Sequence, residues 1–174
     1  VHGEAGATPD SRFTGANDRV FLRRARVILR GQLRPDWSFR LESDFGANSL
    51  APTAGYRAQL TDAFVEWNAH PGAQLRFGQF KTPFGWEQIL SDTRKPFVER
   101  SLPNDRLTTG RQIGVGLSGA ALDQRLEYSA GVFNGNGVNN SNNDNDDFLS
   151  AGRVALRGWS GHVGGQAASW TVAT

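Results

Sequence analysis

The chain has 174 residues, no cysteine and a formal net charge of +2 at pH 7. A charge this small does not by itself indicate a nucleic-acid partner, and the lack of cysteine excludes both a disulfide framework and a thiolate metal site. No run approaches the roughly 20 apolar residues that a membrane-spanning helix requires, which excludes a helical membrane protein. A transmembrane β-barrel is compatible with the sequence, because its lipid-facing side uses only alternate residues of each strand.

Residues 21–45 have the pattern of a β-hairpin. In the first half, counting in twos places mostly apolar residues on one face, while the other face carries Arg24, Arg26 and Arg30. Residues 34–36, with the sequence "RPD", have the chemistry of a turn. In the second half, the alternating residues are Trp37, Phe39 and Leu41 on the apolar face and Ser38, Arg40 and Glu42 on the polar face.

Further alternation along the chain predicts the remaining strands. They fall at residues 59–68, 74–81, 111–118, 126–132 and 153–157, and a weak eighth strand starts near His162. Residues 82–110 are too long for an ordinary connection and contain a predicted helical turn after Trp86, while residues 134–147 form a polar, low-complexity loop. The predicted fold is therefore all-β, an antiparallel up-and-down arrangement of about seven or eight strands.

The predicted connections alternate between short and long. The short ones lie at residues 34–36, 69–73 and 119–123, with long ones between them. In an antiparallel meander this alternation gives the sheet two different ends, which is the organisation of outer-membrane barrels with tight periplasmic turns and long outer loops. We therefore expect all the short connections at one end of the sheet and all the long ones at the other.

The alternation also predicts which side chains share a face. The residues expected on an outward, apolar face are Trp37, Phe39, Leu41, Val65, Trp67, Leu75, Phe77, Val115, Leu117, Tyr128, Val132, Val154 and Leu156. The charged residues expected on the inward face are Arg24, Arg26, Arg30, Arg40, Arg76, Arg125, Arg153 and Arg157, with Glu42, Asp44, Asp62, Glu66 and Glu127. If this face lines a water-filled lumen, the excess of arginine over acids favours anions modestly.

Several longer segments together resemble a known family. They are, in chain order, "LRRARVILRGQL", "WSFRLESDF", "LTDAFVEWN", "LRFGQFKTPFGWE", "FVERSLPN", "RQIGVGLSG" and "YSAGVFNGNG". Over roughly residues 20–157 they resemble the phosphate-selective porin O and P family. The resemblance implies a sixteen-stranded transmembrane β-barrel in the outer membrane, assembled as a homotrimer. It also implies one loop folded into the lumen, and arginines that guide phosphate to a constriction lined with lysine and arginine.

The resemblance further implies which residues contact the solute. Lys81 in "GQFKTPFG" and Arg94 in "SDTRKPFVER" stand where constriction residues are expected. The other predicted anion-binding residues, of which the first three would be rungs of an arginine ladder, are Arg24, Arg26, Arg30, Arg40 and Arg100. The implied function is passive diffusion of anions, phosphate or polyphosphate above all, across the bacterial outer membrane. Catalysis, a cofactor and a metal are not expected.

The predicted organisation is a polar N-terminal segment, residues 1–19, followed by part of a barrel domain, residues 20–174. Within that domain, residues 82–110 are expected to fold into the lumen, and residues 134–147 to form an outer loop. Only about seven or eight strands fit in this length, and the chain ends in "ASWTVAT" without a terminal aromatic strand. We therefore interpret it as a piece of a longer chain.

Other interpretations fit parts of the sequence. The chain could be a soluble β-sandwich or adhesion module that binds acidic glycans through its basic face, or a structural outer-membrane barrel that does not conduct. The arginines could also form ordinary ion pairs across neighbouring strands. The residues of this last alternative are Arg24, Arg26, Arg40, Glu42, Asp44 and Asp62.

Two local motifs suggest other chemistry but do not support it. "GVGLSG" matches the dinucleotide-binding pattern, yet the region about 20 residues further on is polar and lacks the required acidic residue. "NNDNDDF" suggests calcium, but a loop starting at Asp144 has Leu149 in place of the required glycine and Ala155 in place of the bidentate glutamate. A strand-and-turn glycine pattern and a solvated loop are the better interpretations.

Overall fold

The computed structural model describes residues 22, 24–46, 57–70, 72–90, 101–163 and 166–173, and the predicted polar segment 1–19 lies outside them. The elements, in chain order, are β1 (Arg26–Arg34), β2 (Trp37–Asp44), β3 (Gln59–His70), β4 (Ala73–Lys81), α1 (Trp86–Ile89), α2 (Leu102–Leu107), β5 (Arg111–Ala121), β6 (Leu126–Phe133), β7 (Leu149–Val163) and β8 (Gln166–Ala173). Within the described residues, no helix is long and apolar enough to cross a membrane.

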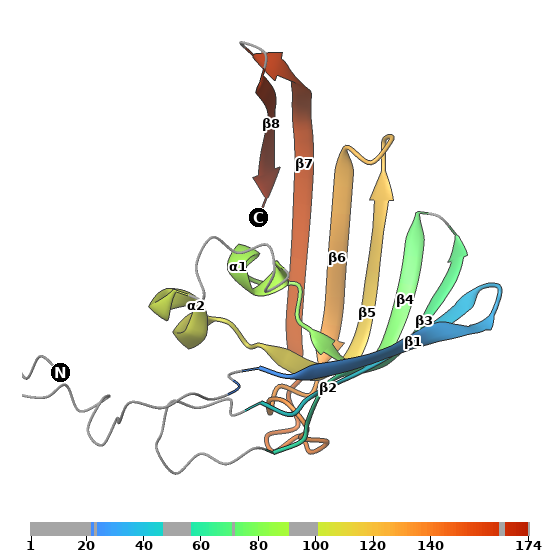
Figure 1. Cartoon of the computed structure of the whole chain (residues 1–174), viewed down its shortest axis with the longest axis vertical. Coiled ribbons are helices and arrows are strands. Elements are labelled where there is room, and N and C mark those ends of the chain that lie inside the picture. Colours follow the sequence, from blue (N-terminus) through green and yellow to red (C-terminus); the bar gives the residue numbers. More distant parts are fainter. Residues whose placement is uncertain are drawn as a thin grey trace, which may run out of the picture.

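The strands form a single eight-stranded antiparallel sheet in which each strand pairs with its neighbours in the chain. Figure 1 shows this order around one curved sheet, in which β1 and β2 cross the picture while β5, β6 and β7 stand upright. The predicted all-β, up-and-down topology is confirmed. A β-sandwich needs a second sheet packed face to face on the first. The described strands form one sheet, so the sandwich alternative is wrong.

The start of the first strand differs from the prediction. β1 begins at Arg26 instead of near residue 21, because its partner β2 ends at Asp44, directly opposite Arg26. Ala25 is held just outside the strand, where its backbone N–H donates to Asp44 Oδ1 at 3.1 Å. The carboxylate therefore caps the edge of the hairpin at the point where the backbone ladder stops.

The two ends of the sheet differ as predicted. Since odd-numbered strands run one way and even-numbered strands the other, the short connections after β1, β3, β5 and β7 share one end, and the long connections after β2, β4 and β6 share the other. One turn is displaced: β5 continues to Ala121, and residues 122–125 make the turn. Arg125, predicted on the inward face of a strand, therefore lies in that turn.

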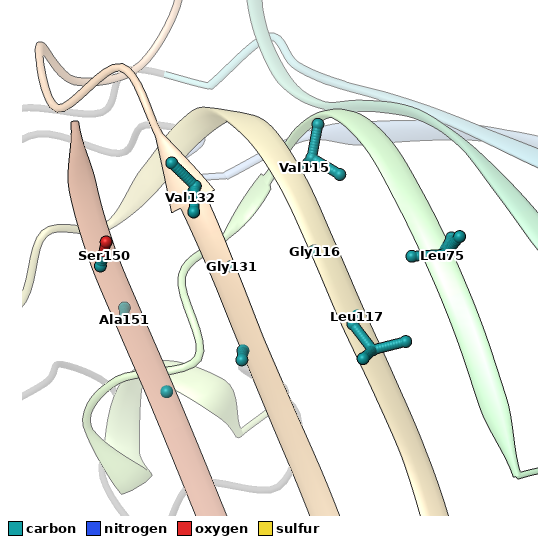
Figure 2. A pocket seen from close by; sticks show the side chains of 10 residues that line it. Leu75, Val115, Gly116, Leu117, Gly131, Val132, Ser150 and Ala151 are labelled. Carbon is teal, nitrogen blue, oxygen red and sulfur yellow. The ribbon is translucent and has the colours of Figure 1, made fainter.

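The register confirms the predicted apolar face. Cross-strand partners join its residues in rows, of which one runs Phe39, Val65, Phe77, Val115, Val132 and another runs Trp37, Trp67, Leu75, Leu117. Figure 2 shows Leu75, Val115, Leu117 and Val132 around a shallow apolar hollow on this face. Val115 and Val132 are 46% and 48% exposed. Such an exposed apolar surface needs an apolar partner.

On the opposite, charged face, two phenylalanine rings lie close to the sheet backbone. Phe80 and Phe133 are 5% and 1% exposed, and their rings meet edge to face with centroids 5.3 Å apart. A Cβ atom at Gly116 would lie 2.9 Å from Phe80 Cζ, and one at Gly131 would lie 2.6 Å from Phe133 Cζ. Glycine at these two positions therefore makes room for the rings.

The long segment between β4 and β5 is closed at its base by Thr82, which is fully buried. Its backbone N–H donates to the carbonyl oxygen of Gly110 at 3.0 Å. Further along the segment, α1 confirms the predicted helical turn after Trp86. The guanidinium carbon of Arg153, on the charged face of β7, lies 5.3 Å from the centroid of the Trp86 ring. This contact places the start of α1 against the charged face.

Two buried glutamines hold the 134–148 loop against the sheet. Gln79 Oε1 accepts from the backbone N–H of Asn139 at 2.6 Å, and Gln112 Oε1 accepts from that of Gly137 at 2.8 Å. Their amide groups donate in turn to backbone carbonyl oxygens of the sheet and of the long segment, at Leu60, Thr61 and Thr109. The 134–148 loop and the end of the long segment before β5 are thus tied to the same wall.

We expect Gln79→Leu to increase the amide hydrogen exchange of residues 134–148 by about tenfold, because it leaves the Asn139 N–H without its acceptor on the sheet. Hydrogen exchange with mass spectrometry in detergent would measure this. Gln124→Leu, in the exposed turn at the other end of the sheet, is the control and should leave the loop unchanged. Equal protection in both variants would show that the glutamine does not hold the loop.

Candidate solute-binding face

Six charged side chains gather on the charged face where β1, β2 and β3 lie side by side and β5 begins. We call them the arginine–acid cluster; its members are Arg26, Arg40, Arg111, Glu42, Asp44 and Asp62. Three guanidinium groups meet three carboxylates, so the formal charge of the cluster is zero. The cluster therefore adds little to the long-range field of this face.

Glu42 lies at the centre of the arginine–acid cluster, with a side chain only 2% exposed. Its Oε2 accepts a hydrogen bond from Arg40 Nη2. Its Oε1 lies 3.5 Å from Arg26 Nη1 and 3.6 Å from Arg111 Nη2. One buried carboxylate is thus surrounded by three guanidinium groups.

The other two carboxylates complete the pairing. Asp44 Oδ2 accepts from Arg26 Nε at 2.9 Å. Asp62 Oδ1 accepts from Arg111 Nε at 2.6 Å, and Asp62 Oδ2 lies 3.3 Å from Arg40 Nε. The alternative of cross-strand ion pairs is therefore confirmed for Arg26 and Arg40. Because the carboxylates are buried, these pairs are more strongly coupled than exposed ones.

Two more arginines of the charged face are paired. Arg76 donates from both Nε and Nη2 to Glu66 Oε2, its cross-strand partner, and its guanidinium lies 4.3 Å from the centroid of the Phe64 ring. Arg157 Nη2 lies 3.3 Å from Glu127 Oε1, and both side chains are about half exposed. Among the described residues, the arginines of this face therefore do not form a continuous line of unpaired positive charges.

The remaining predicted site residues are dispersed. Arg24 lies just before β1, and Arg30 lies in β1 opposite Arg40 and is exposed. No ion pair to Arg30 occurs within the described residues. Lys81, the last residue of β4, donates from Nζ to the carbonyl oxygen of Leu90 at 3.2 Å. Arg94 and Arg100 lie outside the described residues.

Two hollows on the charged face share the hydroxyl residues Ser118 and Ser129. A small one, of about 50 Å³, is also lined by Arg76 and Lys81. A larger and mostly polar one, of about 430 Å³, is also lined by Arg153. The serine pair therefore lies between Arg76 and Lys81 of β4 and Arg153 of β7.

Sequence patterns did not identify the serines or Arg111 as part of this surface. Isolated serines and a strand-initial arginine carry no distinctive local signal. Arg111 forms ion pairs with Glu42 and Asp62, which are far from it in the sequence, so no local sequence spacing predicts these contacts. The one sequence signal is the alternation of faces. It places Ser118 on the same face of its strand as Gly116, which lies opposite Arg76 in the sheet.

The sheet has one face with polar donors, basic groups and buried ion pairs, and an exposed apolar face on the other side. Its two ends also differ in the length of their connections. These features together are those of the wall of an outer-membrane β-barrel. The chain belongs to the phosphate-selective porin O and P family, whose model matches residues 1–171. Members of this family are outer-membrane proteins of Gram-negative bacteria, and the family is one of channels and not of enzymes.

The chain is also similar to a curated relative, Porin O of Pseudomonas aeruginosa. The two are 29% identical over 84 residues, which make up 48% of this chain and 18% of that protein. The match thus spans less than a fifth of the length of the relative.

Proposed function

We propose that the chain forms part of the wall of a passive anion channel, with phosphate or polyphosphate as the preferred solute. The observation that supports this most is the position of Lys81 at the base of the long segment, in a hollow shared with two serine hydroxyls. A phosphate partly stripped of water would gain charge-assisted hydrogen bonds there. A homotrimer embedded in outer-membrane lipid is part of the same proposal, on the strength of the family.

The pairing of the wall arginines changes how selectivity would arise. The arginine–acid cluster is neutral, and Arg76 and Arg157 each face a glutamate. We therefore assign the anion preference to basic groups that meet the solute at close range, with residues 82–110 folded into the lumen. The contact of Trp86 with Arg153 supports that placement of the segment. Lys81, Arg94 and Arg100 are the proposed constriction residues.

Charge reversal at the constriction tests the proposal. In the full-length barrel, Lys81→Glu combined with Arg94→Glu is expected to shift the reversal potential in a potassium chloride gradient toward cation preference, because it replaces the cations nearest the solute by anions. Block of the chloride current by inorganic phosphate should weaken as well. Planar bilayer recordings measure both quantities.

The control is Arg125→Glu, in the turn at residues 122–125. Its effect should be much smaller, because a charge outside the constriction is screened within about 8 to 10 Å at physiological salt. If the double variant keeps the selectivity and the phosphate block of the parent, the constriction lies elsewhere. If the parent barrel does not conduct at all, the non-conducting structural barrel is the correct alternative.

A further inference from the structure

We propose that Ser118, Ser129 and Arg153 form a subsite for a tetrahedral oxyanion on the charged face, next to Lys81, whose smaller hollow is lined by the same two serines. This inference rests on the proposed function, since it assumes that anions reach this face. It begins from the register of the sheet. Gln74, Ser118, Ser129 and Arg153 are consecutive cross-strand partners on β4, β5, β6 and β7.

A row of this kind brings its side chains within reach of one small ligand. Neighbouring strands are about 4.8 Å apart, so the two serine hydroxyls and the base of Arg153 are spaced at about the width of a phosphate group. The same residues line one mostly polar hollow of about 430 Å³. Serine hydroxyls and a guanidinium are the donors that an oxyanion accepts from, and the guanidinium matches two of its oxygens at once.

Arg153 differs from the paired arginines of the wall. Within the described residues no carboxylate lies at ion-pair distance from it, and its recorded contact is with the face of the Trp86 ring, 5.3 Å from guanidinium carbon to ring centroid. An aromatic face holds a guanidinium in place without neutralising its charge. The positive charge of Arg153 is thus positioned and still available to an anion.

One acidic residue, Glu127, lines the same hollow and opposes anion binding. Its Oε1 lies 3.3 Å from Nη2 of Arg157, which is on the same face of β7 as Arg153. The pair is neutral as a whole, so Arg153 leaves the hollow with a net positive charge among the described residues. We therefore expect the hollow to select anions with several acceptor oxygens over chloride.

The test separates hydrogen bonding from charge. In the full-length barrel, Ser118→Ala combined with Ser129→Ala is expected to weaken block of the chloride current by inorganic phosphate about tenfold, because two donors to a charged ligand are lost. The reversal potential in a potassium chloride gradient should stay unchanged, because the formal charge does not change. Arg153→Gln should weaken the block and also lower the anion preference.

Two controls complete the design. Ser150→Ala removes a hydroxyl from the apolar face and should leave phosphate block as it is. Ser118→Thr combined with Ser129→Thr keeps both hydroxyls and should retain most of the block, which distinguishes lost donors from a disturbed fold.

Phosphate block that is unchanged in the double alanine variant, in a barrel that still prefers anions, would overturn the subsite and leave the proposed function standing. Cation preference in the parent barrel would contradict the proposed function, whereas phosphate block that depends on the serines would still support the subsite. Absence of any phosphate block in the parent would contradict both.

Discussion

Replacing Glu42 by glutamine is expected to lower the free energy of unfolding by about 3 kcal/mol, because it leaves three guanidinium groups without their shared buried counter-charge. The Glu42 side chain is 2% exposed, whereas those of Arg26, Arg40 and Arg111 are 26%, 31% and 13% exposed. Partial access to water moderates the loss, so the value lies at the lower end of the range for broken buried pairs. Urea unfolding of the barrel refolded in lipid would measure it.

Glu127→Gln is the matched control for this prediction. It makes the same chemical change on the same face, but Glu127 and its partner Arg157 are 47% and 48% exposed. An exposed ion pair contributes at most about 1 kcal/mol. Equal destabilisation by the two substitutions would mean that the arginine–acid cluster is not held together by Glu42.

Leu29→Arg is expected to lower the stability of the folded barrel in a bilayer by about 2 to 4 kcal/mol, because an outward-facing charge near the middle of a strand enters the hydrocarbon. Leu29 is 56% exposed and lies opposite Leu41 on the apolar face. Folding titrations into phospholipid vesicles would measure the loss. The same substitution in detergent micelles, where the face is more easily wetted, should cost less.

Ile28→Arg supplies a close comparison. Ile28 is the preceding residue of β1, is 48% exposed, and lies opposite Glu42 on the charged face. A charge placed there stays in water, so the expected loss is below about 1 kcal/mol. A larger loss for Ile28→Arg than for Leu29→Arg would reverse the assignment of the two faces, since a slip of one residue exchanges them.

The sequence alone predicted the strand content, the apolar face and the separation of short from long connections, because each depends on local chemistry. Successive side chains of a strand point to opposite faces, so Val115 and Leu117 can be assigned to a common face without knowing which strands pair with theirs. Errors occurred at strand ends, where pairing partners decide the boundary. β1 begins at Arg26 because β2 stops at Asp44, and β5 extends into the predicted turn, as far as Ala121.

Only the tertiary structure determined which arginines of the wall are paired with carboxylates and which are not. Arg26 and Arg153 look alike in sequence, each an arginine in an alternating strand. The curved sheet brings Arg111 of β5 to Glu42 of β2, although β3 and β4 lie between these strands in the sheet order. Arg153 instead meets an aromatic ring from the long segment. Alternation along a strand assigns a side chain to a face. Whether its charge is neutralised depends on residues that are distant in sequence, because the Coulomb energy of two charges is set by their separation in the folded structure.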